Sequence, residues 1–153
     1  MDREILFRGK DLETGKWLYG SFIKTPNHAH ISTSGEAFPA KVAPKTISQY
    51  TGLTDKNSTK IFEGDVLHFG DKNYLVFWND ECFQWQMRIR KDGFSFPVYS
   101  GQDTGCPVEC ITLSWVAAEI PILGTMSTEI VGNIYDNPEL IAPAKKKNEN
   151  EVK

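Results

Sequence analysis

Residues 65–90 read DVLHFGDKNYLVFWNDECFQWQMRIR, and this stretch decides the fold class. Two apolar runs, 65–69 and 74–78, flank a Gly-Asp-Lys-Asn sequence of the kind that forms hairpin turns. From residue 83 to residue 90, apolar and polar side chains alternate with the period of two that a β-strand imposes. The stretch therefore predicts three short strands, the first two joined as a hairpin.

The alternation in residues 83–90 separates aromatic from basic side chains. One face would carry Phe83, Trp85, Met87 and Ile89, and the other would carry Gln84, Gln86, Arg88 and Arg90. We predict that the aromatic face packs in a core, opposite a solvated charged face. The alternative is a platform for single-stranded nucleic acid, with Arg88, Arg90 and Lys91 as the binding residues.

Short strand patterns continue outward from this stretch in both directions. Residues 11–16 separate two apolar runs as in a β-hairpin, where Gly15 can adopt a positive φ. Residues 25–46 predict an irregular excursion with one strand near 30–33, and residues 51–58 predict turns. Asn137 followed by Pro138 predicts at most two turns of helix. The clearest predicted strands are 5–8, 17–23, 65–69, 74–78, 83–90 and 129–135, with less than about a fifth of the chain helical.

Many short strands joined by local turns are typical of a mainly β fold, a small barrel or sandwich with little helix. The 153 residues and 40% hydrophobic content suit one domain with its own core. We expect a single β domain over residues 1–141, in which residues 1–43 form an N-terminal hairpin subdomain. Residues 142–153 are polar and rich in lysine, which predicts a disordered tail.

Charge is distributed unevenly along the chain. The net charge is −3, but the tail from residue 144 carries four lysines against two glutamates, so residues 1–143 carry −5. A net-acidic body disfavours broad non-specific binding to nucleic acid. The N-terminus lacks the apolar run of a secretory signal, and residues 111–123 are too short and too interrupted to span a bilayer. We therefore expect a cytoplasmic protein without membrane contact.

Neither metal binding nor catalysis is predicted. The three cysteines, an odd number, suit reduced thiols. A zinc site is the alternative, because Cys106 and Cys110 lie close in sequence. Its further ligands would come from Cys82, His28, His30 or His68. The chain has no nucleophile elbow, phosphate-binding loop or dinucleotide fingerprint. We expect a protein that is not an enzyme and holds no cofactor.

Three segments of the chain share a further pattern. They are REILFR (3–8) with TGKW (14–17), QYTGLTDKN (49–57) with KIFEGDV (60–66), and GNIYDNPEL (132–140). In this order and spacing they resemble the YopX family, small proteins encoded by phages and prophages. The resemblance implies a β-rich fold with an SH3-like β-barrel, to which the N-terminal hairpin is added. It implies no catalytic residue.

The motif residues that form turns are the candidates for either a structural role or a binding loop. They are Tyr50, Gly52, Asp55, Lys56, Asn57, Gly64, Asp65, Asn133 and Asn137. Their Gly, Asn and Asp content favours turn geometry over binding. One departure from the family pattern is Ser58, which stands where glycine is usual, and we expect some strain in that turn.

Taken together, these patterns predict a non-enzymatic phage accessory protein that acts by binding. A protein partner is favoured by the acidic body, and self-association is a further expectation because small β-rich folds must cover their edges. A single-stranded nucleic-acid-binding barrel is the alternative. A small hydrolase or nuclease is a third reading, and it would need a cleft with clustered carboxylates or histidines.

Overall fold

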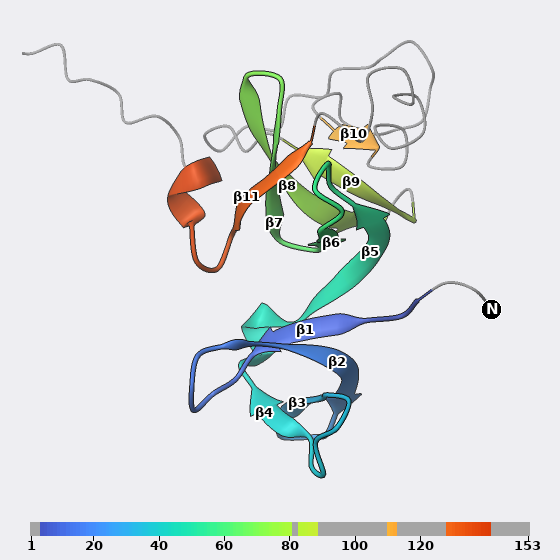
Figure 1. Ribbon diagram of the computed structural model, residues 1–153, viewed down its shortest axis with the longest axis vertical. Coiled ribbons are helices and arrows are strands. Elements are labelled where there is room, and N and C mark those ends of the chain that lie inside the picture. The colour runs from blue at the N-terminus through green and yellow to red at the C-terminus, as the bar shows by residue number, and fades with distance from the viewer. Residues whose placement is uncertain (1–3, 81–82, 89–109, 113–127, 142–153) are drawn as a thin grey trace, which may run out of the picture.

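The structure, a computed structural model, describes residues 4–80, 83–88, 110–112 and 128–141, which form two antiparallel sheets (Figure 1). The first sheet has the strand order β4-β3-β2-β1-β5-β6 and the second the order β10-β9-β8-β7-β11. The strands of the first sheet are β1 (Phe7–Lys10), β2 (Trp17–Lys24), β3 (Ala29–Ser32), β4 (Ala40–Val42), β5 (Ser48–Thr54) and β6 (Lys60–Phe62). Those of the second are β7 (Asp65–Phe69), β8 (Lys72–Asn79), β9 (Gln84–Arg88), β10 (Cys110–Thr112) and β11 (Glu129–Asn133).

Local sequence patterns placed most strands correctly. The strand predicted at 65–69 is β7, and those predicted at 17–23 and 74–78 are β2 and β8, each slightly longer than expected. The strand predicted at 5–8 begins and ends two residues later, as β1. Its register follows from the turn, where Gly15 has φ 69° and Lys10 pairs with Trp17. The mainly β fold with little helix is confirmed for the described residues, whose helical segments are two short 3-10 turns, η1 (Pro44–Thr46) and η3 (Pro138–Ile141).

The segment from residue 25 to residue 46 is more regular than its composition predicts. It contains two strands, β3 and β4, which pair with each other, and β3 also pairs with β2. β4 was not foreseen because a strand of three residues carries too little periodicity to detect. The prediction of turns over 51–58 was wrong at its start, since β5 runs to Thr54. Its register against β6 shifts between Tyr50 and Thr54, around Gly52 at φ 90°.

Each sheet has its own hydrophobic core. Buried Ala29, Ile31 and Val42 lie inside the curved first sheet. A second cluster joins the sheets, because Ile61 of β6 packs with Leu67, Val76 and Met87 on one face of the second sheet. The opposite face of that sheet carries a third cluster, in which Val66 and Leu75 are covered by Ile141 of η3. Figure 1 shows β5 running from one half of the molecule to the other.

The first sheet curls until its outer strand returns to β1. Asp11 forms an isolated bridge with Val42, the Leu12 N–H donates to the Lys41 carbonyl (3.0 Å), and the Ala43 N–H donates to the Lys10 carbonyl (2.8 Å). Nevertheless, the strands of the described residues form two open sheets rather than a closed barrel. The SH3-like barrel and the division at residue 43 remain predictions. The tail predicted for residues 142–153 lies outside the described residues. No helix within the described ranges has the length and hydrophobicity for a membrane crossing.

Candidate binding surfaces

A buried arginine connects the two sheets. Arg8 of β1 is 6% exposed, and its Nη2 lies 2.5 Å from the carboxylate of Asp65, the first residue of β7. The guanidinium lies between two rings, 4.5 Å from the centroid of Trp17 and 4.7 Å from that of Phe62. Burial raises the pKa of Asp65, whereas the charge of Arg8 and the N–H of Phe62, which donates to Asp65 Oδ2 (2.8 Å), oppose this rise.

Asp136 ties the turn after β11 to the first hairpin. Its carboxylate pairs with Lys10 and accepts hydrogen bonds from the indole N–H of Trp17 and the side-chain amide of Asn133, both at 2.9 Å. The hydrogen bond from Lys10 is the main reason why the pKa of Asp136 falls to about 2, against a small opposing effect of burial. The turn is thereby locked onto β1 and β2.

A third cation repeats this arrangement at the start of β6. The Lys60 ammonium lies 5.4 Å from the Tyr50 ring and donates to both carboxylate oxygens of Glu4, at 2.6 and 2.7 Å. Tyr50 in turn lies against Phe62, with ring centroids 5.6 Å apart. We call this set the junction: three cations, each over an aromatic ring and beside a carboxylate. Its members are Glu4, Arg8, Lys10, Trp17, Tyr50, Lys60, Phe62, Asp65 and Asp136.

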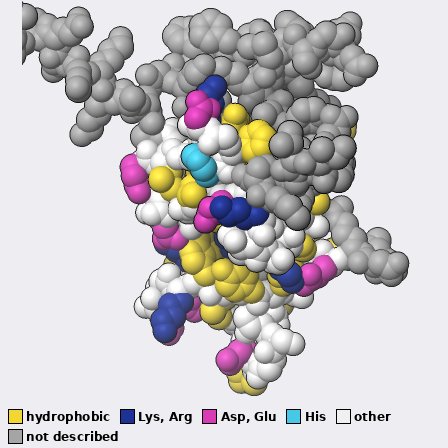
Figure 2. Space-filling view, turned by 45° about the horizontal axis from the view of Figure 1, so that its top comes forward, with side chains coloured by type: hydrophobic (Ala, Val, Ile, Leu, Met, Phe, Trp, Pro, Cys, Tyr) yellow, Lys and Arg dark blue, Asp and Glu magenta, His cyan; other side chains and the backbone are white. Residues whose placement is uncertain are grey.

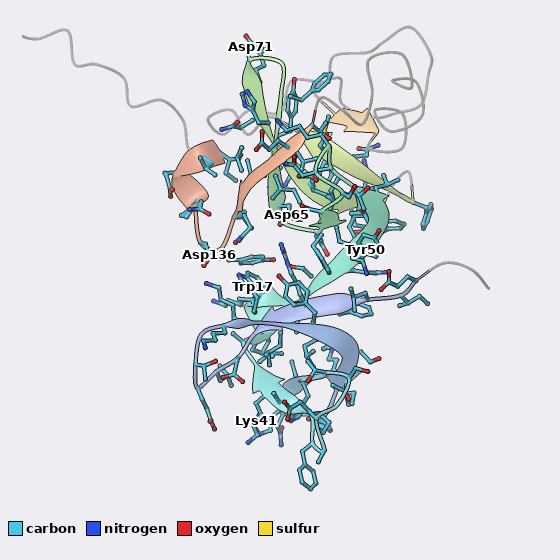
Figure 3. All side chains as sticks on the ribbon, in the orientation of Figure 1. Trp17, Lys41, Tyr50, Asp65, Asp71 and Asp136 are labelled. Atoms are coloured by element: carbon cyan, nitrogen blue, oxygen red, sulfur yellow. The ribbon has the colours of Figure 1, made fainter. Side chains whose placement is uncertain are left out.

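Figure 3 shows Trp17, Asp65 and Asp136 at the level where the two halves of the molecule meet. Figure 2 shows hydrophobic side chains gathered in the middle of one face, with basic and acidic side chains around them. The charges of the junction are matched within the chain, because each of its three cations forms an ion pair. Three segments that are distant in sequence contribute to it, and Tyr50 and Asp65 are the motif candidates among its members.

The turn that follows β5 is organised by Asp55. This side chain is buried, and its carboxylate accepts hydrogen bonds from the backbone N–H groups of Asn57 (2.8 Å), Thr59 (2.9 Å) and Ile130 (3.2 Å). Burial raises the pKa of Asp55, but these donors outweigh it, so the pKa lies below its ordinary value. The last donor belongs to β11, so Asp55 covers part of an outer strand of the second sheet.

Neighbouring motif residues also make contacts within the chain. Lys56 pairs with Glu129, and its N–H donates to the Thr128 carbonyl (3.0 Å). Ser58 has φ 61°, a left-handed conformation that favours glycine and strains a residue with a side chain.

Gly64 and Asn133 place the second and third motif segments side by side. Gly64 has φ 79°, and a Cβ atom there would lie 2.9 Å from the ring of Tyr135, so only glycine fits. β11 ends at Asn133, two residues before the predicted end of this strand at residue 135. The chain turns there because the side-chain oxygen of Asn133 accepts hydrogen bonds from the N–H groups of Tyr135 (3.0 Å) and Asp136 (2.9 Å). The Asn137 N–H donates to the Asn133 carbonyl (2.8 Å) just before η3.

The predicted basic site is only partly within the described residues. Arg88 is exposed and lies 4.3 Å from the Phe77 ring centroid, whereas Arg90 and Lys91 lie outside the described residues, as does Ile89. The register places Arg88 opposite Leu75 and Trp85 opposite Trp78, so the arginine and the tryptophans occupy different faces. One expectation was wrong: Gln86 is 1% exposed instead of solvated. Its Oε1 accepts a hydrogen bond from Asn79 Nδ2 (2.9 Å), and this contact satisfies a buried polar group.

The turn end of the β8–β9 hairpin exposes aromatic side chains. Trp78 and Trp85 are cross-strand partners with ring centroids 5.1 Å apart, and Trp78 is 38% exposed. Phe83 is 79% exposed and has φ 51°, a costly conformation for a bulky residue. The buried indole N–H of Trp85 has no acceptor among the described residues. We call Trp78, Phe83 and Trp85 the aromatic end.

Metal ligands do not gather within the described ranges, where no group of three His, Cys, Asp or Glu side chains could hold an ion. The rings of His28 and His30 lie 6.0 Å apart. His68 instead contacts Asn73, at 2.9 Å. Cys82, Cys106 and the side chain of Cys110 lie outside the described part of the structure.

Two members of the junction, Tyr50 and Asp65, were among the predicted site residues. The other seven were not: Glu4, Arg8, Lys10, Trp17, Lys60, Phe62 and Asp136. All of these except Lys10 lie in segments that carry the family resemblance, which was the available indication. Their convergence was not predictable from spacing, since the carboxylate partners lie 57 and 126 residues away from Arg8 and Lys10.

The protein is mainly β, and its two antiparallel sheets meet at the junction, where cations pair with carboxylates and lie against aromatic rings. The chain matches the sequence model of the YopX family, described as YopX protein, over residues 6–142. It therefore belongs to the YopX family. No protein with a curated description matches the chain.

Proposed function

We propose that this YopX protein is a non-enzymatic binding module that acts on a protein partner. The observation that carries the proposal is the aromatic end of the β8–β9 hairpin. An exposed phenylalanine in a left-handed conformation costs folding free energy, of the order of 1–2 kcal/mol from the backbone alone. Exposed aromatic side chains are common anchors in protein interfaces, so partner binding would explain why this unfavourable conformation is present.

The wider setting of this proposal is an accessory role for a phage or prophage protein in the host cytoplasm. Family membership supports it, and the acidic composition favours a protein partner over nucleic acid. We further propose that the chain contains an SH3-like β-barrel, to which the N-terminal β-hairpin of β1 and β2 is added. Support comes from β1, which pairs with both β2 and β5 and so joins the hairpin to the strands that follow residue 43.

Single-stranded nucleic acid is the second candidate, because Trp78 and Trp85 offer rings on which bases could stack. The charges argue against it. Arg88 lies on the other face of the sheet, and the exposed carboxylate of Asp80 follows Trp78 closely. Phosphate groups would be repelled at this end of the hairpin.

Affinity capture with matched variants tests the proposal. Wild-type protein, Phe83→Ala and Phe38→Ala would serve as baits in extracts of phage-infected host cells. Phe38 is a control because it is also an exposed phenylalanine, at 84%, but lies in the β3–β4 connection. We expect a protein retained by wild type and Phe38→Ala and lost with Phe83→Ala. Equal capture by all three baits, or capture of single-stranded nucleic acid in place of protein, would contradict the proposal.

A further inference from the structure

The surroundings of the aromatic end are acidic. Asp80 is exposed and lies two residues after Trp78 in the chain. Glu63 approaches from the turn between β6 and β7, where the N–H of the next residue, Gly64, donates to the Val76 carbonyl at 2.9 Å. This hydrogen bond places the turn beside Val76 of β8, two residues before Trp78 in the chain.

The two carboxylates are close enough to affect each other. Burial raises the pKa of Glu63, and the charge of Asp80 raises it further. Within the described part of the chain, neither carboxylate belongs to an ion pair. They differ in this respect from the carboxylates of the junction, each of which is beside a cation. Two neighbouring carboxylates next to exposed rings therefore contribute negative potential that no ion pair of the described residues compensates.

Aromatic rings beside carboxylates favour a cationic ligand. A guanidinium or ammonium group is attracted both by the ring face and by the carboxylate, as Arg8 is by Trp17, Phe62 and Asp65 in the junction. An apolar neighbour of that cation in the ligand would cover Phe83, which is 79% exposed.

We propose that the aromatic end, with Asp80 and Glu63, is a docking surface for a polypeptide segment of a partner protein in which basic and apolar residues alternate. This inference rests on the proposed function and specifies the chemistry of its partner. Phe83 and the ring pair would supply apolar contact, and the two carboxylates would select a basic segment over an acidic one.

Peptide titration with the full-length protein tests this inference. The probe is a short fluorescein-labelled peptide of alternating arginine and leucine, followed by fluorescence anisotropy. A glutamate–leucine peptide of the same length is the control for charge, and a single-stranded oligonucleotide is the control for the other class of ligand. The variants Asp80→Asn and Phe83→Ala change exposed residues, so folding is retained.

Each variant has a matched control. Asp71→Asn makes the same charge change in the exposed β7–β8 turn, and Phe38→Ala removes an equally exposed ring elsewhere. We expect Asp80→Asn to raise the Kd of the arginine–leucine peptide about threefold, as for an exposed ion pair. Phe83→Ala should raise it about tenfold, as for an interface anchor. Both controls should leave it unchanged.

Other results would overturn the inference. If Asp71→Asn and Asp80→Asn weakened binding of the arginine–leucine peptide equally, the peptide would be attracted to the acidic protein in general and not to this surface. Equal binding of the two peptides, no binding of either, or tighter binding of the oligonucleotide would exclude a basic docking segment. The capture experiment decides the proposed function separately, because an acidic or neutral partner lost with Phe83→Ala would support that function while contradicting this inference.

Discussion

The guanidinium of Arg8 and the carboxylate of Asp65 lie 2.5 Å apart, and both side chains are almost completely buried. Their residues belong to different sheets and are 57 positions apart in the chain. A buried charge is costly unless it is paired. The pair therefore stabilises one relative position of the two sheets in the folded protein.

Breaking this pair should destabilise the protein strongly. We predict that Asp65→Asn lowers the free energy of unfolding by about 3–5 kcal/mol, because a buried arginine loses its counter-charge. Urea denaturation measures the change. The double variant Arg8→Met with Asp65→Leu should recover most of the loss, because it removes both buried charges. Asp71→Asn is the control, since Asp71 is exposed in the β7–β8 turn (Figure 3). A small effect of Asp65→Asn would refute the structural role of the pair.

Asp136 should make stability depend on pH in the acid range. Its pKa is lowered to about 2 in the folded protein, so the folded state favours the ionised carboxylate. This contribution is complete above the unfolded pKa near 4 and is lost as the pH falls toward about 2. Thermal melts between these limits should show a smaller decline for Asp136→Asn than for wild type. Parallel declines in the two proteins would show that other carboxylates are responsible.

Replacing Ser58 with glycine should stabilise the turn after β5. Ser58 has φ 61°, where a side chain adds strain that glycine avoids. We expect a gain of up to about 1 kcal/mol after the greater freedom of glycine in the unfolded chain is subtracted. Ser34→Gly is the control, because Ser34 is exposed and its φ is not positive, so that change should be neutral or destabilising. A loss of stability in Ser58→Gly would contradict the strain.

Gly64→Ala should be more harmful than the same change at Gly15. Both glycines have positive φ, at 79° and 69°, so both variants incur left-handed strain of about 1–2 kcal/mol. Only at Gly64 would the new methyl group meet a ring, that of Tyr135 at 2.9 Å, whereas the space beside Gly15 is open. Chemical denaturation of the two variants separates strain from crowding. Equal losses would mean that Tyr135 moves aside without cost.

Trp85 distinguishes a core strand from a binding platform. It packs against the cluster of Leu67, Val76 and Met87, so Trp85→Ala should cost about 3 kcal/mol, the lower end for a large aromatic. Arg88→Ala should change stability little, because Arg88 is exposed. Thermal melts of both variants, beside a titration with single-stranded DNA at low and moderate salt, provide the measurement. A stable Trp85→Ala protein that had lost DNA binding would reverse the core assignment.

Much of the local structure follows from the sequence alone. Alternation and turn residues are sufficient for β2, β7 and β8, because side chains two residues apart face the same way in any strand. Strain at Ser58 was expected from its departure from the family pattern, and its φ of 61° is a conformation that favours glycine. The three motif segments identified the family without any knowledge of their contacts.

The way these elements meet depends on contacts between distant parts of the chain. Residues as distant as Lys10 and Asp136 pair because the chain path brings β1 beside the turn after β11, and no local period encodes that path. Gln86 has the spacing of a solvated side chain, yet it is buried, and Asn79 on the neighbouring strand satisfies its amide oxygen. Local preferences act over a few residues, whereas burial and charge pairing depend on which distant surfaces exclude water together.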